Sequence, residues 1–269
     1  MTLAITRLRD GNGSLDDNPF ELIDPDTEAQ DEQVHVIRKD VVCTTEPKGH
    51  KTPKGASLLE ILLNAPNGFI PLWAPKTTLR WRFQEASLRR YARPEAVKIE
   101  VETLLGEALL AWGDAVPVKF EQADELWDFE IVVRDSDNCS PRGCTLARAF
   151  FPDAGRHELV IFPKMFAQDR QEQIETLVHE LGHIFGLRHF FALVDETAFP
   201  AVLFGTHSTF SIMNYGDDSR LTDADRNDLK QLYTQAWSGQ LTAINGTKIR
   251  LVTPFHASGI RLESDEVLA

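Results

Sequence analysis

The segment VHELGHIFGLRHF, residues 178–190, places three histidines and a glutamate among apolar side chains. On a helix, residues four positions apart share a face, so His179 and His183 can direct both imidazoles at one metal ion. Glu180 is rotated by about 100° from His179 and can lie beside that ion without binding it. This spacing is a zinc-binding pattern in which the glutamate acts as a general base.

The residues that follow extend the pattern. Gly186 comes three residues after His183, where a residue with positive φ could end the helix. A turn there would allow His189 to reach the same ion as a third ligand. Three protein ligands leave the fourth tetrahedral position to water, which is typical of catalytic zinc. Zinc lowers the pKa of that water to about 7, and Glu180 could take its proton.

Three helices are expected around these residues. Apolar periodicity predicts long helices over residues 93–115 and 168–187, and the second of them carries the histidines. A third helix is expected over 221–237, where Thr222 and Asp225 have the spacing of a capping box. A single buried histidine is usually only a core residue, but this full string on a helix that ends at a glycine favours a metal site.

The strands are predicted by short alternating or apolar runs. They are TLRWRF, VKFEQ, WDFEIVVRD, CTLARAFFP and HELVIFP, with a further β-rich segment near TKIRLVT. The order strand, helix, strands, helix and helix predicts a layered α+β or α/β domain, with the second long helix behind the sheet.

Three parts of the chain differ in composition. Residues 1–70 are first acidic and then rich in Lys, Pro and Gly, and we expect an extended arm with a short helix over 57–65. Residues 71–238 carry the periodic elements and form the expected catalytic domain. Residues 239–269 are expected to be a C-terminal tail.

Charge and hydropathy exclude several classes of partner. The net charge is -13, and Lys and Arg form no stripe, so neither a nucleic acid nor an anionic membrane is an expected partner. No run of 18 apolar residues predicts a membrane span. The N-terminal sequence does not have the pattern of a signal peptide. We therefore expect a cytoplasmic chain, one exported by a non-classical route, or one numbered without its leader.

The histidine string resembles that of the metzincin metallopeptidases, whose signature includes a downstream methionine turn. FSIMNYG, residues 210–216, is similar to that turn, with Met213 lying 24 residues after His189. The resemblance implies that Met213 forms a hydrophobic floor beneath the metal. Tyr215 matches the astacin and serralysin version of the turn, in which such a tyrosine contacts the metal or the transition state.

Residues 72–236 resemble a matrixin catalytic domain in the order and spacing of their elements. This resemblance implies a metzincin fold, with a mostly parallel twisted sheet, an antiparallel edge strand, two long helices behind it and a third C-terminal helix. It also implies that Leu146 and Ala147 contact an extended peptide substrate on the edge strand. Arg148 replaces the histidine that matrixins use for a structural zinc, so one catalytic zinc is expected and no structural zinc or calcium.

The cysteines leave alternatives open. Cys139 and Cys144 could form a small loop disulfide in an oxidising compartment, or remain thiols in a cytosol. Matrixin precursors use an upstream cysteine to occupy the metal, and Cys43 could act as such a latency switch, although DVVCTTEP does not match the matrixin switch sequence. Cys43 could equally be inert, and Asp40 is an alternative of the astacin kind.

Together these features predict a zinc-dependent endopeptidase that acts on protein or peptide substrates. A first alternative is a catalytically silent zinc-containing domain that binds peptides, although such a domain would not need Glu180 as a base. A second alternative is a zinc hydrolase of non-protein amides. A third is a latent enzyme whose residues 1–70 cover the site.

Overall fold

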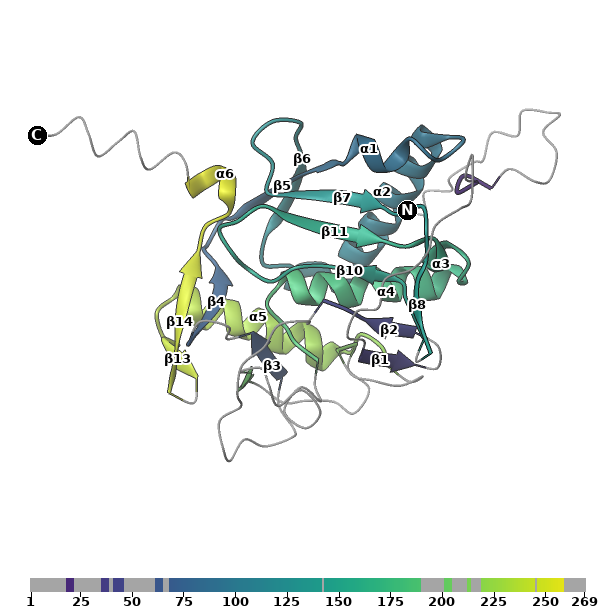
Figure 1. Ribbon diagram of the computed structural model, residues 1–269. Coiled ribbons are helices and arrows are strands. Elements are labelled where there is room, and N and C mark those ends of the chain that lie inside the picture. Colours follow the sequence, from purple (N-terminus) through teal and green to yellow (C-terminus); the bar gives the residue numbers. More distant parts are fainter. Residues whose placement is uncertain are drawn as a thin grey trace, which may run out of the picture.

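The computed structural model describes residues 18–21, 35–38, 41–45, 61–64, 68–141, 143–189, 201–204, 212–213, 219–244 and 246–258 (Figure 1). The expectations for Asp40 and Tyr215 concern residues outside these ranges. Among the described helices, none has both the length and the apolar character needed to cross a membrane.

A five-stranded sheet forms the centre of the molecule, in a mixed α+β arrangement, as predicted (Figure 1). Its order is β10 (Ala147–Arg148), β11 (His157–Ile161), β7 (Phe129–Val133), β5 (Thr78–Phe83) and β6 (Lys119–Gln122). β10 is antiparallel to β11, and the other neighbours are parallel. The strand β7 has the almost continuous apolar sequence FEIVV, as expected for a parallel strand that is covered on both faces.

Three long helices accompany the sheet. They are α2 (Pro94–Trp112), α4 (Arg170–Ile184) and α5 (Asp223–Trp237). Pro94 begins α2, the Asp169 side chain caps α4, and Thr222 and Asp225 form both bonds of the predicted capping box of α5. α2 packs against α4 beneath the sheet, where Trp112 is fully buried. Short helical turns complete this part of the chain: α1 (Glu85–Leu88), η1 (Gly113–Ala115) and α3 (Pro163–Phe166).

A second sheet joins the N-terminal arm to the domain (Figure 1). Its order is β1 (His35–Arg38), β2 (Val41–Cys43), β9 (Gly143–Thr145) and β8 (Asn138–Ser140). β2 runs parallel to β9, so the arm extends the β8–β9 hairpin. Cys139 and Cys144 face each other across that hairpin and form a disulfide.

A C-terminal segment packs against the opposite side of the domain. β13 (Ala243–Ile244) and β14 (Thr247–Val252) form a sheet with β4 (Phe69–Trp73), in which β14 is parallel to β4. The short helix α6 (Phe255–Ser258) follows.

The predicted helix over residues 57–65 is wrong for residues 61–64. These residues form β3 (Ile61–Asn64), which pairs in antiparallel fashion with β12 (Ala201–Phe204). A short apolar run is compatible with either structure, and here its partner strand lies far away in the sequence. Periodicity within the run contains no information about that partner.

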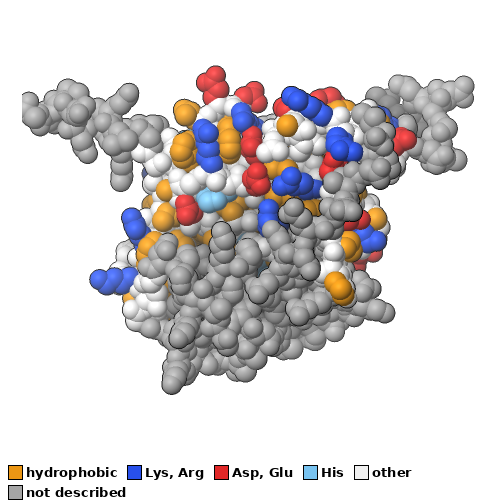
Figure 2. Space-filling view, in the orientation of Figure 1, with side chains coloured by type: hydrophobic (Ala, Val, Ile, Leu, Met, Phe, Trp, Pro, Cys, Tyr) orange, Lys and Arg blue, Asp and Glu red, His pale blue; other side chains and the backbone are white. Residues whose placement is uncertain are grey.

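The described surface carries charges of both signs. Figure 2 shows Lys and Arg side chains interspersed with Asp and Glu over the described part of one face. On that part of the molecule, the basic side chains are not gathered into a stripe.

Candidate metal and catalytic site

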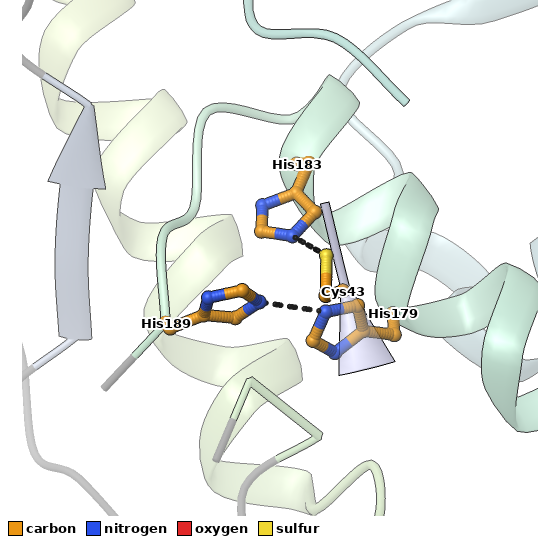
Figure 3. Close-up of side chains that lie close together, drawn as sticks. All are labelled: Cys43, His179, His183 and His189. Carbon is orange, nitrogen blue, oxygen red and sulfur yellow. Dashed lines mark hydrogen bonds between the residues drawn. The ribbon is translucent and has the colours of Figure 1, made fainter. Parts of the chain in front are cut away.

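The last two turns of α4 and the chain that follows it bring three imidazoles together. His179 and His183 lie one helical turn apart, with ring centroids 4.8 Å from each other. The Nε2 atoms of His179 and His189 are 3.0 Å apart. Figure 3 shows the three rings converging from α4 and the segment after it. All three side chains are almost fully buried.

The return of His189 depends on how α4 ends. Gly186 has a φ of 93°, as predicted for the residue after the helix. The backbone N–H of Gly186 donates to the carbonyl of His183 (2.8 Å), and that of Leu187 donates to the carbonyl of Gly182 (2.9 Å). This pair of bonds is a Schellman motif, which reverses the chain within a few residues.

The outer ring nitrogens are held by backbone carbonyls. His179 Nδ1 lies 2.8 Å from the carbonyl oxygen of Ile212, and His183 Nδ1 lies 2.8 Å from that of Leu187. A carbonyl can only accept, so each Nδ1 carries the proton and each Nε2 is the ring nitrogen that can act as a metal donor. Burial and then the neighbouring His189 lower the pKa of His179 to about 3. Neutral rings oriented in this way are suited to bind a metal ion.

Cys43 of the arm provides a fourth donor. Its Sγ is 3.6 Å from Nε2 of His183, and the donor atoms of Cys43, His179, His183 and His189 all lie within 4.8 Å of one another (Figure 3). Tetrahedral zinc with bonds of about 2.0–2.3 Å needs donors about 3.3–3.8 Å apart. The set therefore fits zinc with modest adjustment. Cys43 would therefore be the fourth ligand, in place of the water expected from the sequence.

The chemistry of the thiol depends on this environment. Cys43 is fully buried, and burial followed by nearby Glu180 raises the pKa of its thiol to about 11. The thiol is therefore protonated when no cation is bound. A bound cation favours the thiolate, so Cys43 would gain its charge only as a ligand.

Glu180 lies beside the four donors. Its Oε1 is 3.7 Å from Cys43 Sγ, and its Oε2 accepts a hydrogen bond of 2.9 Å from Thr45 Oγ1. Burial raises the pKa of Glu180 to about 7, and the bond from Thr45 opposes this shift. A carboxyl group whose pKa lies near neutrality can exchange protons with a reacting group.

Met213 packs against α4 at Gly182, between His179 and His183 in the sequence. Its side chain is 4% exposed, and a Cβ built on Gly182 would lie only 2.5 Å from its Sδ. Gly182 therefore allows Met213 to approach the helix between His179 and His183.

Leu146 and Ala147 lie where β9 gives way to β10. Their side chains are 1% and 2% exposed and belong to the core. The carbonyl of Leu146 accepts from the backbone N–H of Phe162 (2.9 Å), which joins this stretch to the sheet. The arm lies alongside the strand that leads into them, because β2 pairs with β9.

Several supporting residues were not found from the sequence. Trp73 Nε1 donates to the carbonyl of Ile184 (2.8 Å), and Tyr233 Oη donates to that of Phe185 (3.1 Å). These bonds satisfy carbonyls at the end of α4, where no helical partner exists. Trp112 Nε1 donates to the backbone carbonyl of Val178, within α4 (2.9 Å). Their apolar surroundings in the sequence gave no sign of this role.

Comparisons with known proteins identify a family and a relative that this chain resembles. The Matrixin family model matches residues 72–234, more than half of the chain. Stromelysin-3 of Homo sapiens is 28% identical over 170 residues, which are 59% of this chain and 32% of that protein, so the chain spans about a third of its relative.

Two solved structures of myroilysin are also similar. One is 13% identical, with a TM-score of 0.41, and the match covers 60% of this chain and 95% of that one. The other is 15% identical, with a TM-score of 0.36, and covers 75% and 98%. The family match spans residues 72–234, a range that includes His179, His183 and His189, and it leads to one conclusion: the chain belongs to the matrixin family.

Proposed function

We propose that this protein is a zinc-dependent metalloendopeptidase that is held latent by its N-terminal arm. The observation that carries the proposal is the convergence of His179, His183 and His189 beside the carboxyl group of Glu180, with Nδ1 of His179 and of His183 held by backbone carbonyls. Membership of the matrixin family supports zinc as the metal and a peptide bond as the target.

His179, His183 and His189 would hold the ion. When bound, zinc would supply a Lewis acid for the scissile carbonyl and for the attacking water. Glu180 accepts the proton of that water and then delivers it to the leaving amine. Its buried position keeps the carboxyl group basic enough for the first transfer, because burial raises its pKa to about 7.

Two further residues have roles that rest on the resemblance to relatives. Met213 would form the floor of the metal site, consistent with its packing on Gly182. Tyr215 would donate a hydrogen bond to the oxyanion that develops on the carbonyl. Residues 71–238 would form the catalytic domain, with residues 239–269 as its tail.

The substrate would be an extended peptide lying along the stretch that contains Leu146 and the first residue of β10, Ala147. β2 of the arm already pairs with β9 just before these residues, which supports the view that this edge accepts an added strand. Backbone pairing makes few demands on side chains, so a protein substrate fits better than a small non-protein amide.

Latency would come from Cys43. Its sulfur lies among the three histidines and would take the coordination position that the attacking water needs. Residues 1–70 would then act as an inhibitory segment, and loss of the sulfur ligand would open the site.

One experiment compares zinc content and casein cleavage for the full chain, Cys43→Ser, Glu180→Gln and the double variant. We expect about one zinc in all four, low cleavage by the wild type, raised cleavage by Cys43→Ser, and a loss of at least 100-fold when Glu180→Gln is added to it. Zinc binding with no cleavage by Cys43→Ser would favour the silent peptide-binding domain. Undiminished cleavage by the double variant would contradict the role of Glu180.

A further inference from the structure

Thr45, two residues after Cys43, joins the arm to two separate parts of the catalytic domain. Its Oγ1 donates to Oε2 of Glu180 (2.9 Å) and accepts from the backbone N–H of Ala149 (3.0 Å). We propose that Thr45 is a second lock on the site, which holds the arm in place and engages the general base without needing the metal. This inference rests on the proposed function, because it concerns the regulation of the same site.

The Thr45 hydroxyl acts both as a donor and as an acceptor in this contact. The single O–H of the hydroxyl donates a hydrogen bond to the carboxyl group of Glu180. When Glu180 is ionised, this bond is stronger than one between neutral groups. Thr45 is 7% exposed and Glu180 is 2% exposed, so water does not compete freely for either atom. The backbone N–H of Thr45 also approaches Cys43 Sγ at 3.5 Å, which ties the hydroxyl and the thiol into one unit.

The two partners of the hydroxyl are the proposed general base, Glu180, and the backbone N–H of Ala149 just after β10. Glu180 must accept a proton from water, and the Thr45 hydroxyl occupies one of its two oxygens. Ala149 directly follows β10, and its N–H is a backbone donor that the arm uses in place of any other extended chain. Release of Thr45 would therefore free the base and an edge donor together, and Thr45 is a positioning residue that acts through Glu180.

Thr44 offers a matched control. It is fully buried, like its neighbour, but its hydroxyl has no hydrogen-bond partner among the described residues. Thr44→Val and Thr45→Val make the same change in shape at adjacent positions of one strand end. Only the second removes the bonds to Glu180 and Ala149. Thr45→Ser keeps the hydroxyl and should restore the lock.

The first readout is the rate at which iodoacetamide alkylates Cys43 in the metal-free full chain, with the Cys139–Cys144 disulfide intact. Cys43 is fully buried, so it reacts only when the arm leaves. We expect Thr45→Val to react at least tenfold faster than the wild type, and Thr45→Ser and Thr44→Val to stay within twofold of it. A tenfold change corresponds to about 1.4 kcal/mol.

Global unfolding would also expose Cys43, so the urea midpoint of each variant is measured in the same buffer. The lock is supported if Thr45→Val raises the alkylation rate of Cys43 by more than its loss of global stability explains. The lock is overturned if the loss of stability explains the whole increase, if the rate in Thr45→Val is unchanged, or if Thr44→Val raises the rate equally.

The second readout is casein cleavage by the zinc-loaded full chain. Thr45→Val should cleave faster than the wild type, and Thr44→Val should not. Alkylation needs neither zinc nor turnover, so the two proposals fail separately. Absence of cleavage in every variant would refute the peptidase and leave the alkylation result to decide the role of Thr45.

Discussion

His157 shows how a single partly buried side chain can set a pH dependence away from the candidate metal site. Its ring stacks on Phe150, with centroids 4.5 Å apart, and its Nε2 is buried without a hydrogen-bond partner among the described residues. Burial lowers the pKa of His157 below its ordinary value of 6.5, and Asp153 at 3.8 Å opposes this only in part. The folded protein therefore binds a proton at this position less readily than the unfolded chain.

The sign of the effect follows directly. The contribution of neutral His157 to the free energy of unfolding is fully present above pH 6.5. It decreases as pH falls below that value, because the unfolded chain takes up the proton first. His157→Phe keeps the stacking and removes the titrating group. We expect urea midpoints measured from pH 7.5 down to pH 5 to fall more steeply for the wild type than for this variant. If the urea midpoints of the wild type and His157→Phe fall in parallel with pH, His157 does not cause the loss of stability.

At the scale of single residues, the sequence indicated the candidate metal-binding histidines and Glu180, but not Thr45, which contacts Glu180. His179, Glu180, His183 and His189 could be placed together because helical spacing and one glycine fix their relation. Thr45 could not be placed, because its partners are remote in sequence and a threonine after a cysteine has no distinctive pattern. Knowing that Thr45 meets Glu180 requires knowing where β2 lies.

At the scale of elements, the packing of α4 makes a glycine necessary in the last turn of this helix. A Cβ at Gly182 would lie 2.5 Å from Met213 Sδ, whereas a Cβ at Gly106 of α2 would meet no atom within 4 Å. Gly106→Ala should therefore stabilise the protein by about 0.5–1 kcal/mol through helix propensity. Gly182→Ala gains the same propensity but overpacks the site, which costs about 1–3 kcal/mol.

Urea unfolding of the metal-free protein distinguishes these two substitutions. We expect Gly106→Ala to raise the midpoint and Gly182→Ala to lower it. If both substitutions raised the midpoint equally, Met213 would not constrain α4 as described.

Elements with strong local signals were predicted well. α2, α4 and α5 begin at a proline or a capping side chain, and both bonds of the Thr222–Asp225 capping box are present. The run CTLARAFFP was expected as one strand but contains β9 and β10, with Leu146 between them. β3 was missed because its pairing with β12 is a tertiary interaction that local periodicity does not encode.

At the scale of the whole molecule, one buried carboxylate fastens the C-terminal segment to the central sheet. Asp128 is 2% exposed and accepts from the backbone N–H of Arg80 (2.7 Å), and from the backbone N–H (2.8 Å) and Nδ1 (2.8 Å) of His256 in α6. Asp128→Ala would leave these buried donors unpaired and should lower the free energy of unfolding by about 2–4 kcal/mol.

A surface carboxylate provides the comparison for this change. Asp114 pairs with Lys230 in solvent, and we expect Asp114→Ala to leave the urea midpoint unchanged within error. If Asp128→Ala lowers the urea midpoint no more than Asp114→Ala does, α6 is not held through the Asp128 carboxylate.

The long-range arrangement was the part least accessible to sequence reasoning. The alternation of strands and helices predicted the layers, but not that β2 would add to β9 or that β14 would pair with β4. Such contacts join segments separated by about a hundred residues or more, and their free energy depends on surfaces that exist only in the folded chain.

The coordination of zinc in the full chain is the most direct test of the central claim. We would load the metal-free protein with one equivalent of zinc and record X-ray absorption at the zinc edge, for the wild type and for Cys43→Ser. The expected wild-type shell contains three nitrogens at about 2.0–2.1 Å and one sulfur at about 2.3 Å, and Cys43→Ser should lose the sulfur. A wild-type shell of nitrogen and oxygen alone would contradict latency through Cys43, and failure to retain zinc after dialysis would contradict the metal site itself.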